Sequence, residues 1–187
     1  MPTNVVLQPA ADRPDLLAVP TAKALAELSG TLPLDSIRVG AIDPALADTA
    51  AFCAEYGVEL SQSANCVVVA AKRAGTTTYA ACMVLATTRA DINGLARRHL
   101  GARKISFAPM DDAVALTGME YGGITPLGLP ADWPILVDAA VAATPEVIIG
   151  SGIRGSKLWL PGSALALFPH AEVLDGLGNP VNGGSAG

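Results

Sequence analysis

Glycine and proline are concentrated in residues 116–130, and this composition predicts a loop that could bind a ligand through its backbone. The segment contains Gly118, Gly122, Gly123, Gly128, Pro126 and Pro130. Glycine allows positive φ and close backbone approach, whereas proline fixes φ and removes a donor, so neither a helix nor a central strand fits. Several N–H groups of such a loop would be free to face a ligand oxygen. The alternative is a long surface connection.

Residues 150–155 read Gly-Ser-Gly-Ile-Arg-Gly and match the G-x-G-x-x-G pattern of dinucleotide-binding loops. Such a site needs a helix to begin at the motif, so that the helix N-terminus meets the pyrophosphate. Here the following residues, 156–161, alternate like a strand and end in proline. We therefore interpret the motif as a turn between two strands that presents Arg154 and Lys157.

Few other side chains could carry chemistry. The chain has two distant histidines, His99 and His170, and its three cysteines lack Cys-x-x-Cys spacing. Zinc sites use three or four such ligands, so we expect no metal and no other cofactor. The cysteines, Cys53, Cys66 and Cys82, are predicted to be buried free thiols. Any catalysis should rest on backbone donors, bound water and one lysine.

Composition and charge limit the class of protein and its partners. The 187 residues are 51% apolar and 16% charged, which predicts one globular domain. Residues 1–62 carry three Lys/Arg and eight Asp/Glu, whereas residues 63–187 carry nine of each. The net charge of −5 argues against bulk binding to DNA or other duplexes, but one RNA end could dock on a local basic patch. No apolar run is long enough to cross a bilayer and no signal peptide is visible, so we expect a cytoplasmic protein.

The hydrophobic pattern predicts an α+β fold with one central mixed sheet of about six or seven strands, partly barrel-like and wrapped by helices. A single domain over 21–174 should follow an extended lead-in over 1–20 and precede a flexible tail over 175–187. Strands are expected at 36–42, 66–71, 77–86, 103–107, 134–137, 146–149 and 156–160. Helices are expected at 21–28, 44–56, 91–99, 110–117, 139–143 and 164–168.

An ordered series of motifs resembles the YbaK/EbsC family, which contains aminoacyl-tRNA editing domains related to the insertion domain of bacterial prolyl-tRNA synthetase. The motifs are Thr117-Gly118, residues 122–128, residues 135–138 and residues 147–155, and the similarity spans roughly 41–167. The resemblance implies a mixed sheet wrapped by helices and hydrolysis of a small, wrongly attached amino acid from tRNA, often tRNA(Pro). It aligns the family's G-x-x-x-P loop with residues 122–126, whose N–H groups would hold the substrate carbonyl or the terminal adenosine. It further implies that a hydroxyl of the terminal ribose helps to activate water.

This chain departs from the family pattern at three positions. Ala64 or Asn65 stands where the family commonly has lysine, Lys157 stands at the position after Arg-Gly-x that can be acidic, and Met119 replaces a frequent tyrosine. We hypothesise that the positive charge has moved to Lys157, which would contact the 3′-terminal phosphate or the ester carbonyl, while Asn65 orients the amino acid. Alternatively, Asn65 is a plain strand cap and Lys157 a solvated strand residue.

Two functions follow from the resemblance. The first is a trans-acting aminoacyl-tRNA deacylase; the second is a module that binds aminoacyl-tRNA or a small acyl or amino-acid ligand without turnover. Predicted partners are the 3′ end of aminoacyl-tRNA and a synthetase, with the protein a monomer or homodimer. The predicted catalytic residues are Gly122, Gly123, Asn65 and Lys157. The predicted substrate-binding residues are Ile124, Thr125, Pro126, Thr117, Gly118, Met119, Ser151 and Gly152. The candidate tRNA contacts are Arg97, Arg98, Arg103, Lys104 and Arg154.

Overall fold

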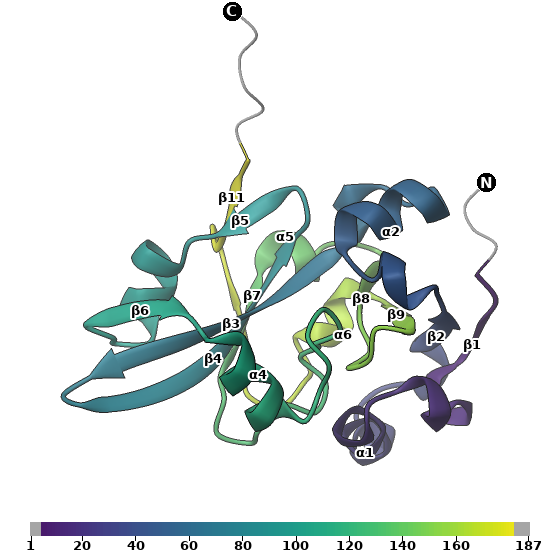
Figure 1. Ribbon diagram of the computed structural model, residues 1–187, viewed down its shortest axis with the longest axis horizontal. Helices are drawn as coiled ribbons and strands as arrows, with labels where there is room; N and C mark the ends of the chain where they lie inside the picture. The colour runs from purple at the N-terminus through teal and green to yellow at the C-terminus, as the bar shows by residue number, and fades with distance from the viewer. Residues whose placement is uncertain (1–4, 182–187) are drawn as a thin grey trace, which may run out of the picture.

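The computed structural model describes residues 5–181, which form two main sheets with helices around them (Figure 1). The helices are α1 (Val19–Glu27), α2 (Thr49–Tyr56), α3 (Arg97–His99), α4 (Met110–Thr117), α5 (Ala139–Ala142) and α6 (Gly162–Leu165). The predicted α+β class is confirmed. The prediction of one central sheet is wrong, because the described strands divide into sheets of five, four and two strands.

The five-stranded sheet is built on a long hairpin, β3 (Ala64–Arg73) and β4 (Thr76–Leu85), as the apolar runs predicted. Its turn residues Ala74 and Gly75 both have positive φ, 49° and 79°, which suits the twist of a tight hairpin. β7 (Ile135–Asp138) lies parallel to β4, and β10 (Ala171–Leu174) lies parallel to β7. β6 (Lys104–Phe107) runs antiparallel along the other side of β3.

The four-stranded sheet has the order β1-β2-β9-β8 and contains the fully buried strand β9 (Ser156–Leu160). Its other members are β1 (Leu7–Pro9), β2 (Arg38–Ala41) and β8 (Val147–Gly150). Outside the named strands, one parallel bridge pairs Ser63, just before β3, with Ile148 of β8. The two sheets therefore meet at one point without merging.

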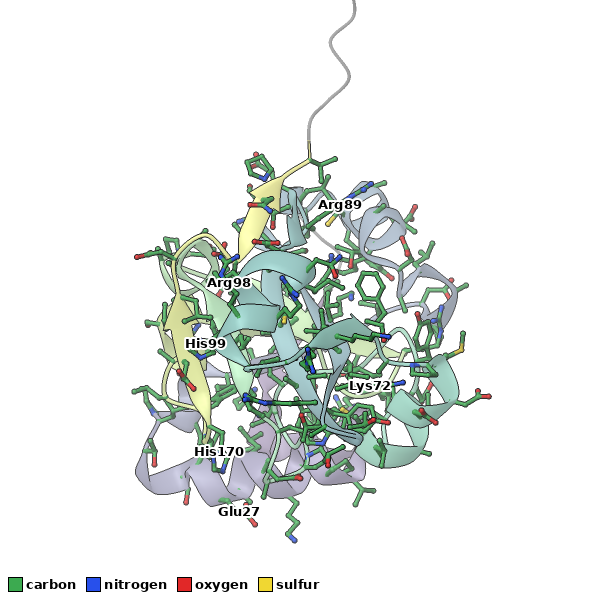
Figure 2. All side chains as sticks on the ribbon, turned by 90° about the vertical axis from the view of Figure 1, so that its left-hand side faces the viewer. Glu27, Lys72, Arg89, Arg98, His99 and His170 are labelled. Carbon is green, nitrogen blue, oxygen red and sulfur yellow. The ribbon has the colours of Figure 1, made fainter. Side chains whose placement is uncertain are left out.

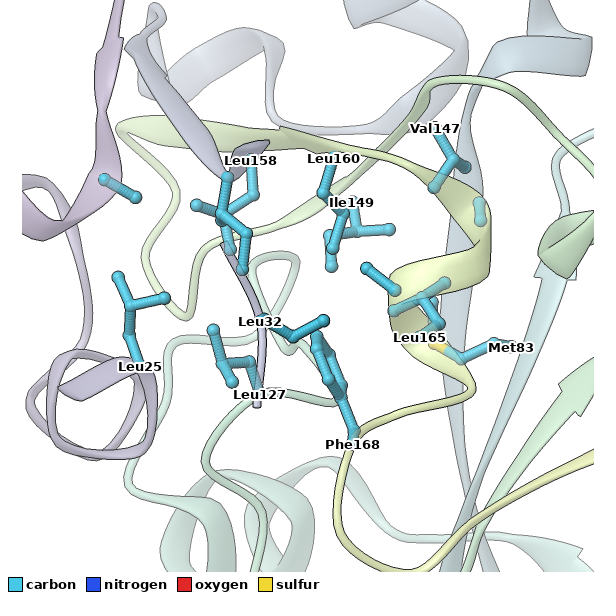
Figure 3. Close-up of a cluster of buried hydrophobic side chains, with 14 of the residues drawn as sticks. Leu25, Leu32, Met83, Leu127, Val147, Ile149, Leu158, Leu160, Leu165 and Phe168 are labelled. Atoms are coloured by element: carbon cyan, nitrogen blue, oxygen red, sulfur yellow. The ribbon is translucent and has the colours of Figure 1, made fainter. Parts of the chain in front are cut away.

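The largest core lies between the sheets and the segments that cover them (Figure 3). Ile149 of β8 and Leu158 of β9 face Leu165 of α6 and Leu25 of α1 in this cluster. Leu127, from the glycine-rich loop, is buried in the same cluster. This anchor explains how a loop without regular structure keeps one shape.

The N-terminal segment is more structured than the predicted extended lead-in. β1 pairs with β2, short 3-10 turns follow at Ala10–Asp12 and Pro14–Leu16, and α1 begins at Val19 instead of position 21. Ala10 is fully buried. These short elements are stabilised by tertiary pairing, which local sequence patterns do not reveal.

The predicted helix over 44–56 is interrupted. Asp43 caps only a 3-10 turn, Pro44–Leu46, and Asp48 then caps α2 by accepting hydrogen bonds from the N–H groups of Ala50 and Ala51. Gly57, with φ of 64°, ends α2 as expected. A second N-cap residue five positions after the first therefore starts a new helix.

The chain after position 175 does not begin as a flexible tail. Leu177 is fully buried and donates its N–H to Oδ1 of Asp138 at 3.1 Å. β11 (Gly178–Pro180) then pairs with β5 (Thr88–Ala90). The predicted tail over 182–187 lies outside the described residues. Within residues 5–181, no helix combines the length and the apolar character that a membrane span requires.

Candidate functional site

A pocket of about 390 Å³ lies among α2, α4, β3 and β9. Figure 1 shows β3 passing between α2 and α4, with β8 and β9 beside it. The pocket is lined by Ala47, Asp48, Thr49, Ala64, Asn65, Cys66, Val67, Val68, Phe107, Ala108, Ala113, Tyr121, Gly122, Ile124, Gly150 and Lys157. It therefore brings together the glycine-rich loop, Asn65 and Lys157, which are far apart in the sequence.

The glycine-rich loop is fastened to the β8–β9 connection through its backbone. Gly152 donates its N–H to the Gly123 carbonyl at 2.7 Å, and Glu120 donates to the Gly152 carbonyl at 2.9 Å. A Cβ on Gly150 would lie 2.5 Å from the Gly123 oxygen, so only glycine permits this approach. The loop is thus held in place from behind while its other side faces the pocket.

The loop has fewer free donors than the sequence predicted. The Gly123 N–H donates to the Glu120 carbonyl at 3.0 Å, so it does not face a ligand. Within residues 5–181, the N–H groups of Gly122 and Ile124 donate no hydrogen bond to the protein. Both residues line the pocket, so their N–H groups are candidate donors to a ligand oxygen, as is that of Tyr121.

Lys157 is the second residue of β9 and is only 7% exposed. Its partners in the neighbouring strands are Gly40 of β2 and Gly150 of β8. The side chains of Val5 and Leu7 lie over Gly40, and the Gly123 carbonyl lies over Gly150. The ammonium nitrogen lies 5.0 Å from the centre of the Phe52 ring, a cation–π distance. The ion pairs found within the described part of the chain do not include Lys157.

Burial lowers the pKa of Lys157, because removal from water disfavours the charged form. Cys53 and Asp48 act in the opposite direction and raise this pKa, whereas the nearby Arg154 guanidinium lowers it. The pocket therefore holds a cation whose charge is incompletely compensated. Such a group is suited to bind an anionic or partly negative oxygen.

Asn65 is oriented by a residue that the sequence analysis did not single out. The Thr49 hydroxyl donates to Oδ1 of Asn65 at 2.7 Å, which leaves the amide N–H groups of Asn65 as donors. Thr49 is the first residue of α2 and also lines the pocket. The Asp-Thr pair at 48–49 is a helix N-cap signal, and it could have revealed this wall of the pocket.

Most of the predicted substrate-binding residues support the loop and do not line the pocket. Thr117 donates to the Ala113 carbonyl at 2.7 Å and accepts from Met119 N–H, which ends α4 at Gly118. Ser151 and Ser156 share a hydrogen bond of 2.7 Å. Of the eight predicted positions, only Ile124 lines this pocket; the others are Thr125, Pro126, Thr117, Gly118, Met119, Ser151 and Gly152. Position beside a loop in the sequence does not show on which side a residue lies.

Four of the five predicted basic residues lie in one surface patch, and the fifth, Arg154, lies elsewhere. Arg97, Arg98 and Arg103 line an open hollow of about 550 Å³ together with Arg73. Lys104 of β6 lies opposite Lys72 of β3 in the antiparallel strand pair. Figure 2 shows Lys72 and Arg98 on one face of the molecule. We call Lys72, Arg73, Arg97, Arg98, Arg103 and Lys104 the basic patch.

Arg154 lies outside this patch and connects two backbone segments. It donates to the carbonyl oxygens of Tyr121 and Pro44 at 3.2 Å and 3.1 Å, and so ties the loop to the segment before α2.

The described residues contain no group of three His, Cys, Asp or Glu side chains placed to bind a metal ion. All three cysteines are free. Cys66 lines the pocket, and burial strongly raises the pKa of its thiol, with Cys82 adding to the effect. Burial also raises the pKa of Cys82 to about 12. Both thiols are therefore protonated at neutral pH and are poor nucleophiles.

The backbone contact between Gly123 and residue 153 predicts a sensitive position. A Cβ on Gly123 would lie 2.6 Å from the carbonyl carbon and oxygen of Ile153, and these backbone atoms cannot move aside. Gly123→Ala should therefore lower the free energy of unfolding by about 1–3 kcal/mol. Gly155→Ala is the matched control, since its Cβ would lie 3.8 Å from its nearest neighbour, the Pro44 side chain. Equal stability of the two variants in urea unfolding would contradict the prediction that a side chain at position 123 clashes with the backbone of Ile153.

The buried cation at Lys157 predicts a pH-dependent stability. The pKa of Lys157 in the folded protein lies below its ordinary value of 10.5. At a pH between the folded-state pKa and 10.5, the unfolded chain therefore binds more protons than the folded protein. The stability of the wild type rises with pH over this range. Lys157→Met removes the cost of burying the charge. It should be at least as stable as wild type at pH 7, with the difference shrinking toward pH 10 in thermal unfolding. Lys72→Met, at an exposed lysine, should show no such trend. A large stability loss at pH 7 that stays constant with pH would contradict the burial cost.

Comparisons with known proteins agree with this architecture. The model of the aminoacyl-tRNA editing domain matches residues 43–168. A candidate trans-editing enzyme for prolyl tRNA synthetase superposes with a TM-score of 0.68 at 21% identity, covering 83% of this chain and 96% of that one. The hypothetical protein APE2540 superposes with a TM-score of 0.72 at 20% identity, covering 85% and 99%. These identities show a shared fold. Because the family model matches well over half of the sequence, this chain belongs to the aminoacyl-tRNA editing domain family, as its YbaK-type motifs predicted.

Proposed function

We propose that this protein is a trans-acting deacylase that hydrolyses a small, wrongly attached amino acid from tRNA in the cytoplasm, with tRNA(Pro) as the first candidate. One observation carries the proposal. The Lys157 ammonium lies in the same pocket as the free N–H groups of Gly122 and Ile124. N–H donors and positive charge near a developing oxyanion accelerate ester hydrolysis, and residues that carry both line this pocket.

The proposed reaction is attack of water on the ester carbonyl carbon. The carbonyl oxygen becomes an oxyanion, which the N–H groups of Gly122 and Ile124 and the Lys157 ammonium stabilise. The bond to the ribose oxygen then breaks; the amino acid leaves with its carboxylate and the ribose oxygen takes a proton. No histidine lines the pocket, so the free hydroxyl of the terminal ribose is the group proposed to position the water.

The pocket walls favour a small side chain. Val67 and Phe107 supply apolar surface from β3 and β6, and Tyr121 stands at the loop. A volume of about 390 Å³ lies near the lower end for small-molecule sites, and the terminal adenosine must share it. Alanine, cysteine and serine fit such a space, whereas an aromatic amino acid would compete with the adenosine.

The basic patch is the proposed contact for the acceptor end of the tRNA. β6 connects the patch to the pocket, since Lys104 begins the strand and Phe107, at its end, lines the pocket. Three residues of strand span about 10 Å, which is within reach of the terminal nucleotides. A synthetase partner remains a further proposal, made from the family alone.

A second candidate function is binding without turnover. It is favoured by Asn65, a neutral residue at the position where the family commonly has lysine. A neutral amide cannot replace the charge of lysine. The deacylase proposal requires Lys157 to supply that charge. The two candidate functions therefore differ in whether Lys157 takes part in hydrolysis.

A panel of aminoacyl-tRNAs separates these candidates. We expect rapid hydrolysis of tRNA(Pro) charged with alanine, cysteine or serine, and sparing of Pro-tRNA(Pro) and Ala-tRNA(Ala). Lys157→Ala should slow the reaction by about 10²–10³-fold, the usual effect of losing one oxyanion donor. Asn65→Ala should also slow it, whereas Lys23→Ala on the exposed face of α1 should not.

Two results would contradict the deacylase proposal. No hydrolysis of any ester by excess folded wild-type protein would favour the binding module. Unchanged rates for both Lys157→Ala and Asn65→Ala would remove these residues from the mechanism even if hydrolysis occurs.

Charge removal tests the basic patch. The triple variant of Arg97→Ala, Arg98→Ala and Arg103→Ala should weaken tRNA binding. It should also reduce the slope of log K against log salt by about 2–3, because each lost phosphate contact removes about 0.7–0.9. Filter binding at several salt concentrations measures this slope, with Lys23→Ala as the control. A slope equal to that of wild type would show that tRNA binds elsewhere.

A further inference from the structure

Asp48 is a carboxylate in the pocket whose hydrogen bonds use only one of its two oxygens. Oδ1 accepts from the N–H groups of Ala50 and Ala51 at 3.1 Å and 3.5 Å, and so caps α2. Within residues 5–181, Oδ2 accepts no hydrogen bond and Asp48 joins no ion pair. The helix cap thus orients the carboxylate, and because Asp48 is exposed, its second oxygen is open to water or to a ligand.

Asp48 supplies the negative charge of the pocket and Lys157 supplies the positive charge. Among the lining residues there is no other Asp or Glu and no other Lys, Arg or His. The two side chains do not form an ion pair among those of the described residues, although Asp48 is close enough to raise the pKa of Lys157. A pocket with one separated negative and one positive charge complements a ligand whose own charges are separated by a short distance.

The aminoacyl group of a charged tRNA has this pattern of charges. Its α-ammonium is positive, and its ester carbonyl, one carbon away, becomes negative as hydrolysis proceeds. If the carbonyl oxygen meets Gly122, Ile124 and Lys157, the ammonium needs an acceptor on another wall, and α2 forms that wall. We infer that Asp48 binds the substrate's α-ammonium group through Oδ2, and thereby selects aminoacyl esters with a free amine. This inference rests on the proposed function of the pocket.

Asp48 therefore acts as a specificity residue, distinct from Lys157. An N-acylated ester, such as an initiator-type or peptidyl ester, offers no ammonium and would leave the carboxylate unpaired. An α-hydroxy ester would lose the charge without adding bulk. The site should discriminate against both, since a charge-assisted hydrogen bond to a carboxylate is worth more than a neutral one.

Binding of a non-hydrolysable analogue tests the inference without requiring turnover. The probes are adenosine carrying alanine through a 3′-amide, its N-acetyl form, and the matching lactyl amide with a hydroxyl in place of the amine. Isothermal titration calorimetry should show that wild type binds the alanyl form about ten- to a hundredfold more tightly than the other two, as expected for one charge-assisted hydrogen bond.

Asp48→Asn isolates the effect of the charge. Asparagine caps helices as well as aspartate does, so α2 stays capped while the charge is lost. It should bind the alanyl and lactyl forms equally. Lys157→Met should weaken both forms while keeping the preference for the amine. Equal preference in wild type and Asp48→Asn would overturn the inference, as would failure of wild type to bind the alanyl form.

The outcome is separable from that of the deacylase proposal. Hydrolysis of free-amine and N-acetyl esters at equal rates would keep the deacylase and overturn the role of Asp48. An Asp48-dependent preference for the amine in a protein without turnover would support the role of Asp48 and contradict the deacylase.

Discussion

The structure depends on one close backbone contact, where the glycine-rich loop meets the connection between β8 and β9. The Gly152 N–H donates to the Gly123 carbonyl at 2.7 Å, and Gly150 provides the space for that carbonyl. Leu127 anchors the same loop in the main core, and Arg154 ties it to the segment before α2. The N–H of Gly123 is used within the loop, whereas those of Gly122 and Ile124, two residues that line the pocket, have no acceptor among the described residues. The contact therefore determines which donors a substrate can meet.

Lys157 shows how the sheet carries a charge into this pocket. The strand β9 is buried along its whole length, and the residues paired with Lys157 in the neighbouring strands are both glycine, at positions 40 and 150. Burial lowers the pKa of the lysine and costs stability, which an apolar residue would avoid. A cost of this kind is typical of functional sites, where a group is held ready for a ligand. The carboxylate of Asp48 on the α2 wall gives the pocket its opposite charge.

Local sequence signals predicted the elements that need little outside support. Both strands of the β3–β4 hairpin and the helix α4 were predicted from the hydrophobic pattern of the sequence. β1 and β11 were missed because each has only three residues and forms through pairing with a distant strand. Leu177 shows the same limit, since its burial depends on Asp138, which lies almost forty residues earlier.

The pocket was predictable in part. The polar departures at 65 and 157 suggested a shared pocket, and both residues line it. Thr117, Met119 and Ser151 were assigned to the substrate because they lie in or beside the family-like motifs, yet their side chains are buried and do not line the pocket. Asp48 and Thr49 were overlooked because the segment from Asp43 to Tyr56 was read as one helix. Facing direction and helix breaks are set by tertiary packing, which spacing alone does not show.

The most direct test of the central claim is a crystal structure of the protein with adenosine carrying alanine through a 3′-amide. The account predicts that the amide carbonyl oxygen lies about 3 Å from the nitrogen of Gly122 or Ile124, with the Lys157 ammonium beside it. Binding in the separate cavity between Pro126 and His170, or an empty pocket at saturating ligand, would contradict the assignment of this pocket as the site of ester hydrolysis.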